Sequence, residues 1–143
     1  MGLALSSLSN AMIDNTDAAA VFATKLPSGS SIRIPEHLAQ LFENNRFQDY
    51  DFGPEENMVR YGNDTPPLFD VSEISGIPVA LFIAGMDTLE GPLDNQWLAT
   101  QLEDVLVYNT VYPNYSHFDF YLAENPEDYL NDIIDLLSEY NNP

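Results

Sequence analysis

Residues 77–84 read Ile-Pro-Val-Ala-Leu-Phe-Ile-Ala, an uninterrupted apolar run that lies between Gly76 and Gly85. A short run of this kind, bounded by glycines, is typical of a parallel strand that is covered on both faces. Gly91-Pro92 opens a predicted helix, and residues 105–111 form a second strand rich in β-branched side chains. Strand, helix and strand within about 35 residues make a βαβ unit, whose right-handed crossover leaves the two strands parallel. The sequence therefore predicts an α/β fold.

The chain closes with its clearest helical pattern. Asn125 is suited to cap this helix, and Pro126 is suited to its first position. An apolar stripe follows at helical spacing and consists of Tyr129, Leu130, Ile133, Ile134, Leu137 and Tyr140. Polar side chains form the opposite face, namely Asn131, Asp132, Asp135 and Glu139. We expect the helix to pack on the sheet.

The first half of the chain is weakly patterned. Residues 27–31 read Pro-Ser-Gly-Ser-Ser and predict a loop, and residues 35–42 predict a short helix. Residues 44–70 combine aromatic, acidic, glycine and proline residues without a clear period. This composition favours an irregular segment that lies over another part of the protein.

The composition excludes several classes of partner. The 143 residues are 45% hydrophobic, which suffices for a packed core, and 23 acidic against 4 basic residues give a net charge of −19. Nucleic acid and anionic membrane surfaces are excluded because both are bound mainly through Lys and Arg. The absence of cysteine and the presence of only two histidines exclude thiolate and His-rich metal sites, so we expect no metal and no cofactor. No stretch has the length of a transmembrane segment, and residues 1–11 lack the pattern of a signal peptide.

Two chemically capable side chains come after the predicted strands. Asp87 follows the first strand in Ala84-Gly85-Met86-Asp87, and His117 follows the second by a few residues. Loops that leave the same edge of a parallel sheet can meet, because neighbouring strands lie about 4.8 Å apart. A carboxylate that accepts the Nδ1 proton of a histidine leaves Nε2 free to act as a general base. We therefore single out Asp87 and His117 as a candidate catalytic pair.

Plainer interpretations stay open at this point. An aspartate after a strand is often a turn or capping residue, and a lone histidine among aromatic residues is often structural. Asp119 is a rival carboxylate, which can instead bond to the local backbone and order the loop. No nucleophile is evident, since the chain contains no Gly-x-Ser-x-Gly, and Ser30 and Ser31 lack the strand-to-helix turn that exposes a nucleophile.

From about residue 27 to residue 140 the chain resembles the C-terminal part of the acid lipase family, the α/β-hydrolases that include gastric and lysosomal acid lipases. The resemblance rests on the order and spacing of six segments, which are residues 46–53, 65–71, 77–80, 85–89, 115–120 and 126–134. Three positions depart from the family pattern: Ala84 stands where the family usually has Gly, Met86 where it usually has Asn or Lys, and Ser116 where it usually has Asn.

The resemblance implies a fold and a function. Residues 1–75 would be the remnant of a cap or lid region, and residues 76–143 the C-terminal part of an α/β-hydrolase core. Asp87 would be the acid and His117 the base of a Ser-His-Asp triad that acts on neutral lipid esters, either acylglycerols or sterol esters. The nucleophile would lie outside this chain, so we expect the chain to be inactive alone.

The resemblance also implies a secreted or lysosomal origin, which agrees with a glycosylation sequon at Asn63. The alternative is a non-catalytic acidic interaction module, or a truncated and unstable fragment. In both cases we expect self-association, because the first strand would present an exposed sheet edge.

Overall fold

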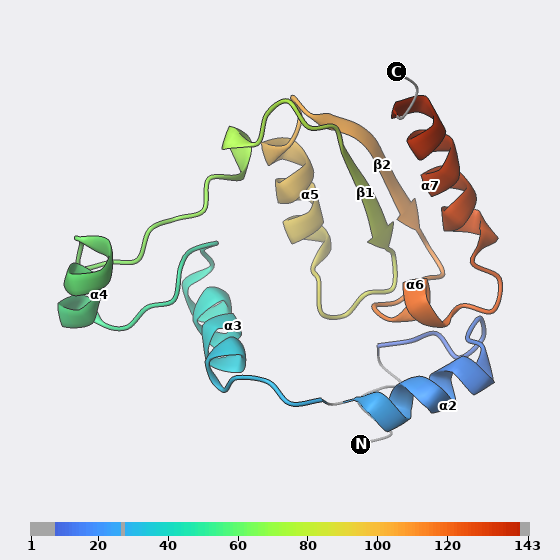
Figure 1. Cartoon of the computed structure of the whole chain (residues 1–143), viewed down its shortest axis with the longest axis horizontal. Coiled ribbons are helices and arrows are strands. Elements are labelled where there is room, and N and C mark those ends of the chain that lie inside the picture. Colours follow the sequence, from blue (N-terminus) through green and yellow to red (C-terminus); the bar gives the residue numbers. More distant parts are fainter. Residues whose placement is uncertain (1–7, 27, 141–143) are drawn as a thin grey trace. The chain divides into compact units, whose positions relative to one another are not determined.

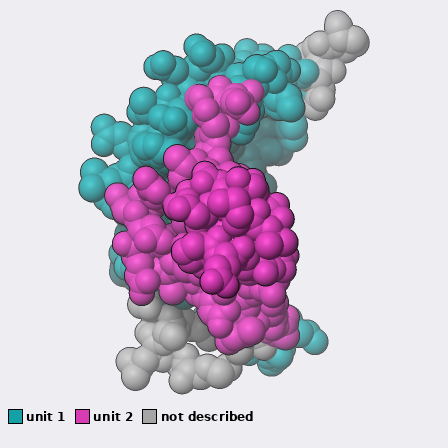
Figure 2. Space-filling model, turned by 90° about the vertical axis from the view of Figure 1, so that its left-hand side faces the viewer, with its two compact units in different colours: residues 1–26, 74–143 teal, residues 27–73 magenta. Residues whose placement is uncertain are grey.

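A computed structural model describes residues 8–26 and 28–140 (Figure 1). Residues 1–7 of the opening segment and Pro27 of the predicted loop lie outside the described residues. The chain divides into two compact units, of which unit 1 comprises residues 1–26 and 74–143 and unit 2 comprises residues 27–73 (Figure 2). This division differs from the expected boundary at residue 75, because residues 1–26 group with the C-terminal half. The cap identity of the first 75 residues stays a prediction.

Unit 1 contains the predicted βαβ unit. Strand β1 (Val79–Ala84) pairs in parallel with β2 (Leu106–Tyr112), and helix α5 (Pro92–Gln101) connects them (Figure 1). The register aligns Val79 with Leu106 and Ala84 with Tyr112, with one irregularity after Val79. The α/β prediction is therefore confirmed for a two-stranded parallel sheet with its crossover helix.

The two faces of the sheet carry different helices. Helix α5 lies over the face of Ile83 and Val111, where it borders an open cleft of about 620 Å³. The other face is aromatic: the ring of Phe82 stacks on that of Tyr112 at 6.1 Å between centroids, and helix α7 (Glu127–Tyr140) covers it. No residue of β1 is fully buried, so the expected complete cover on both faces is only partial.

Helix α7 packs on the sheet as expected but turns a different side toward it. Asp132, expected on the outer polar face, accepts hydrogen bonds from the hydroxyls of Tyr108 (2.6 Å) and Tyr112 (2.5 Å). These bonds lower the pKa of Asp132 against the opposing effect of burial. Ile134 and Leu137, part of the predicted apolar stripe, remain 57% and 54% exposed. The hydroxyls of Tyr108 and Tyr112, which lie between the sheet and the helix, require a hydrogen-bond acceptor. Helix α7 is therefore rotated so that Asp132 supplies this acceptor.

Unit 2 contains two helices. Helix α3 (Arg33–Asn44) includes the predicted helix of residues 35–42, and α4 (Pro54–Tyr61) lies where an irregular segment was expected, so that part of the prediction is wrong. The signals for α4 were local: Pro54 occupies its first turn, and Gly62 ends it in the left-handed region at φ 73°. Eight residues are too few to show a clear helical period.

A buried amide organises unit 2 around α4. Asn57 is fully buried, and its side chain accepts a hydrogen bond from the backbone N–H of Phe52 and donates to Asp51 Oδ1 and to the carbonyl of Asp64. Two cations lie over the ring of Phe52. The Arg60 guanidinium is 4.1 Å from the ring centroid and the Arg33 guanidinium is 5.3 Å from it. Residues 51–53 therefore form a hydrogen-bonded turn against Asn57.

Three further elements complete the described chain: helix α2 (Thr16–Lys25), the 3₁₀ turn η1 (Val71–Glu73) and the short helix α6 (Asp119–Leu122). Among the described residues the buried apolar side chains are few, namely Pro66, Leu102, Tyr112, Tyr115 and Leu122. A self-sufficient domain of this size normally buries about 68–70% of its unfolded surface. The small core and the short chain fit a fragment of a larger fold. No described helix has the length and apolar character needed to cross a membrane.

Candidate functional site

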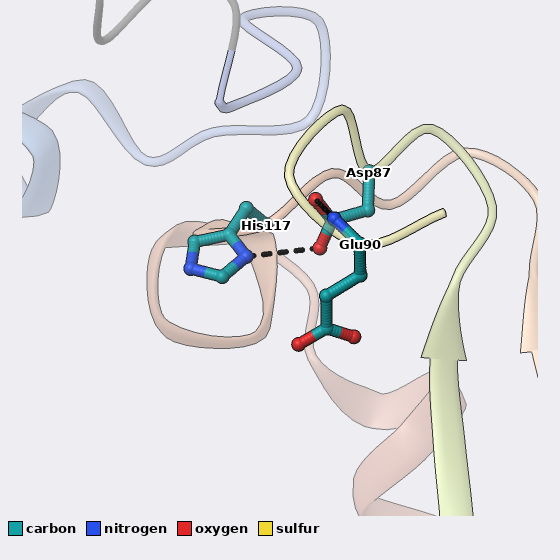
Figure 3. Close-up of side chains that lie close together, drawn as sticks. All are labelled: Asp87, Glu90 and His117. Atoms are coloured by element: carbon teal, nitrogen blue, oxygen red, sulfur yellow. Dashed lines mark hydrogen bonds and ion pairs between the residues drawn. The ribbon is translucent and has the colours of Figure 1, made fainter. Parts of the chain in front are cut away.

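The structure brings Asp87 and His117 together beyond the carboxyl ends of the two strands (Figure 3). Asp87 lies in the loop after β1 and His117 in the loop after β2, and Asp87 Oδ2 is 2.9 Å from His117 Nδ1. The Asp87 side chain is 6% exposed and that of His117 is 31% exposed. Nε2 of His117 is not hydrogen-bonded to any described residue, so the ring has one bonded and one accessible nitrogen.

Asp87 is held by its own loop as well as by the histidine. Its Oδ1 accepts hydrogen bonds from the backbone N–H groups of Leu89 (2.8 Å) and Glu90 (3.2 Å). Burial alone would raise the pKa of Asp87, but the bond to His117, the two backbone donors and the charge of the imidazolium together lower it. An ionised Asp87 selects the tautomer with the proton on Nδ1 and leaves Nε2 to accept a proton.

A close backbone approach joins the two loops. Gly85 donates its N–H to the carbonyl of Tyr112 (2.9 Å), and Met86 donates to the carbonyl of Tyr115 (2.8 Å). A Cβ placed on Gly85 would lie 2.8 Å from the Cα of Pro113, closer than real Cβ atoms come to backbone. Gly85 is therefore the residue that lets the loop of Asp87 lie against the loop of His117.

The rival carboxylate Asp119 does not contact His117. It is fully buried and accepts hydrogen bonds from the backbone N–H groups of Ser116 (2.5 Å) and Asn10 (2.9 and 3.1 Å). The interpretation that Asp119 bonds to the local backbone is confirmed. Its bond to Asn10, more than a hundred residues away, has no signal in the sequence.

A second carboxyl group lies against Asp119. Burial raises the pKa of Asp14, as does its hydrogen bond with the Asp119 carboxylate, while a hydrogen bond with Ser9 acts in the opposite direction. One oxygen of Asp14, Oδ1, is buried without a hydrogen-bond partner. A proton on Asp14 would satisfy this arrangement, because two close carboxylates do not readily ionise together.

One set of described side chains offers metal ligands. Asp87, Glu90 and His117 present ligand atoms that all lie within 4.8 Å of one another, and Figure 3 shows Glu90 beside the pair. The Nδ1 atom of His117 and both oxygens of Asp87 already have partners, and Glu90 is exposed. The geometry therefore gives no reason to prefer a bound cation over the hydrogen-bonded pair.

Two further residues singled out from the sequence, His37 and Asn63, lie in unit 2. The second histidine, His37, bonds through Nε2 to the carbonyl of Gln48 (2.8 Å), which is a structural role. Asn63 is exposed next to α4, and its glycosylation stays a prediction. Within the described residues no hydroxyl is hydrogen-bonded to His117. The arrangement holds one ring nitrogen of His117 against a carboxylate.

Comparison with known proteins gives consistent relatives. Bovine (Bos taurus) gastric triacylglycerol lipase is 32% identical over 121 residues, which are 83% of this chain and 30% of that lipase. Human (Homo sapiens) lipase member K is 32% identical over 84% of this chain and 30% of its own, and mouse (Mus musculus) lipase member N is 35% identical with the same shares. The chain thus spans about 30% of the length of the curated relatives it matches. No family model matches the chain.

The close approach at Gly85 can be tested by substitution. We expect Gly85→Ala to destabilise the protein by about 1–3 kcal/mol, because the new methyl group would push the Pro113 backbone away. Thermal unfolding measures this loss. Gly29→Ala is the matched control, since a Cβ at Gly29 meets nothing within 4 Å. Equal unfolding temperatures for both variants would contradict the interpretation.

The Asp14 carboxyl predicts a pH dependence. The pKa of Asp14 is raised in the folded state, so ionising this carboxyl destabilises the folded protein. This loss of stability is absent below the unfolded pKa of 3.8, grows as the pH rises, and is complete above the folded pKa. Asp14→Asn is neutral throughout, so its unfolding temperature should rise relative to wild type as the pH increases from 4 to 7. Asp104→Asn, at an exposed turn, is the matched control. A constant difference for Asp14→Asn would disprove the prediction.

Proposed function

This chain is acid lipase-like, and from that premise we propose that it carries the acid and the base of a carboxylic ester hydrolase with a Ser-His-Asp mechanism. The observation that carries the proposal is the hydrogen bond between Asp87 and His117, at the sheet edge where open α/β folds place their chemistry. Their residue types, order and accessible Nε2 all suit general-base catalysis.

The proposed reaction assigns one role to each group. A serine on another segment attacks the ester carbonyl while Nε2 of His117 takes its proton, and the same imidazolium then protonates the leaving alcohol. Asp87 keeps the Nδ1 proton in place and stabilises the imidazolium. Water repeats the sequence on the acyl-enzyme, which releases the fatty acid and restores the serine.

The substrate class follows from the relatives and from the surface of unit 2. The relatives include triacylglycerol lipases, and we propose neutral lipid esters, either acylglycerols or sterol esters. Residues 1–75 would be a remnant of the cap, and the exposed Phe42, Phe47 and Phe69 suit an apolar substrate entrance. A secreted or lysosomal location is proposed on the same basis, with Asn63 as the glycosylation site.

The second candidate is a non-catalytic fragment that associates through apolar surface. Among the described strands, β1 pairs only with β2, so its other edge is open. Ile77, Leu93 and Val111 are 65%, 76% and 55% exposed around this sheet. Open edges and apolar surface of this kind favour pairing with further copies of the chain.

A chimera tests the enzymatic proposal. The matching 121-residue segment of bovine gastric triacylglycerol lipase is replaced by this chain, which restores a nucleophile on the same polypeptide. We expect hydrolysis of a short-chain p-nitrophenyl ester, and we expect Asp87→Asn or His117→Gln to lower kcat by about a thousandfold or more. Asp104→Asn is the matched control. A folded chimera that is active without His117, or inactive with the full pair, would refute the proposal. Robust hydrolysis by the chain alone that is lost on Asp87→Asn would refute only the expectation that the nucleophile lies outside this chain.

Size-exclusion chromatography with light scattering tests self-association. We expect the isolated chain to form dimers or larger species whose proportion grows with concentration, because its apolar surface lacks cover. Lys substitutions at two exposed positions, Leu93→Lys and Val111→Lys, should shift the distribution toward monomer. A sharp monomer peak with cooperative thermal unfolding would instead indicate an autonomous domain.

A further inference from the structure

The segment of residues 8–15 lies along the loop and short helix that follow β2, although it is about a hundred residues away in sequence. Backbone hydrogen bonds hold the two together, namely Phe118 N to Leu8 O (2.8 Å), Glu124 N to Ile13 O (2.7 Å) and Asn15 N to Leu122 O (2.7 Å). Asp14 also forms an antiparallel bridge with Ala123. The segment therefore flanks His117 on its C-terminal side over several residues.

Asp119 joins this segment to the histidine loop. Its carboxylate accepts from Ser116 N, the residue before His117, and from Asn10 N in the segment. Asp119 N in turn donates to the carbonyl of Ser116 (3.1 Å), so residues 116 and 119 close a tight turn with His117 inside it. Since the carboxylate is fully buried, its bonds to N–H dipoles are strong and its removal leaves these donors unsatisfied.

The same segment also reaches the loop of Asp87. Asn10 Nδ2 donates to the carbonyl of Asn114 (2.8 Å) and lies 3.8 Å from Met86 Sδ. Ser116 Oγ donates to the carbonyl of Met86 (3.4 Å), the residue before Asp87. Both loops that carry the candidate pair are thus tied to one another and to Asn10 by residues adjacent to the pair.

These contacts lie on the backbone around the pair and not on the reacting atoms. The ring of His117 has a single hydrogen bond within the described residues, to Asp87, so its position depends on how firmly residues 116–119 are held. Catalytic geometry tolerates displacements of only about 0.5 Å. A group that fixes this turn would therefore control how His117 meets Asp87.

We propose that Asp119 is a positioning residue, which holds His117 against Asp87 by accepting the backbone N–H groups of Ser116 and Asn10. The proposal rests on the proposed role of His117 as the base. Asn10 is the partner on which Asp119 depends, because it supplies two of the bonds to the carboxylate and a third to the loop itself.

NMR of the full chain tests the proposal without any ester. The ring ¹⁵N shifts of His117 report the tautomer, which should favour Nδ1–H in the wild type and approach that of free histidine in Asp87→Asn. Asp119→Asn keeps the side-chain shape but replaces one acceptor oxygen with a donor, so the ring shifts should move toward the Asp87→Asn values. Asp135→Asn, on the exposed side of α7, is the matched control and should leave them unchanged. A folded Asp119→Asn protein with the wild-type ring shifts would overturn the proposal.

A second variant covers the case in which Asp119→Asn does not fold. Asn10→Pro keeps the buried carboxylate and removes the Asn10 backbone N–H that donates to it, and we expect a smaller movement of the ring shifts in the same direction. Unchanged shifts in folded Asn10→Pro would overturn the proposal. In the bovine chimera, Asp119→Asn should lower kcat at least tenfold with little change in KM, and Asp135→Asn should not. An inactive chimera with the expected ring shifts would reject the hydrolase proposal and leave the positioning role standing.

Discussion

The parallel pairing of β1 with β2 determines where the chemistry of this protein lies. Parallel strands end at the same edge, so the segments that follow them start only one strand spacing apart. The two segments then approach closely at Gly85 and Pro113, where backbone hydrogen bonds continue the pairing beyond the sheet. Asp87 and His117 meet because their loops leave this junction together. Without the junction, a separation of 30 positions in the sequence would leave the distance between the two side chains undefined.

Three acidic side chains of unit 1 accept hydrogen bonds from backbone, tyrosine and histidine donors. Every Lys and Arg lies at or before residue 60, so residues 61–143 contain no Lys or Arg. Asp119 is bound by backbone N–H groups, Asp132 by two tyrosine hydroxyls, and Asp87 by backbone N–H groups and an imidazole. Directed dipoles stabilise a buried carboxylate only at short distance and good angle, so each of these bonds fixes geometry as well as charge.

Several elements could be predicted from sequence because their signals are local. The apolar run of β1, the Gly-Pro start of α5 and the capped pattern of α7 all correspond to observed elements. Helix α4 was missed because eight residues show too little periodicity, although Pro54 and Gly62 marked its ends. The face of α7 was wrong because hydrophobicity alone does not reveal that tyrosine hydroxyls of β2 need Asp132.

By itself, the sequence determined the α/β class, the order of strand, helix and strand, and the identity of Asp87 and His117 as the candidate pair. Each of these depends on short-range spacing or on residue type, which a chain carries before it folds. Only the tertiary structure decided that Asn10 and Asp119 bond, that Gly85 lies against Pro113 and that Asp132 faces the sheet. These contacts join residues between 20 and 109 positions apart, and loop closure over such distances leaves no periodic trace in the sequence.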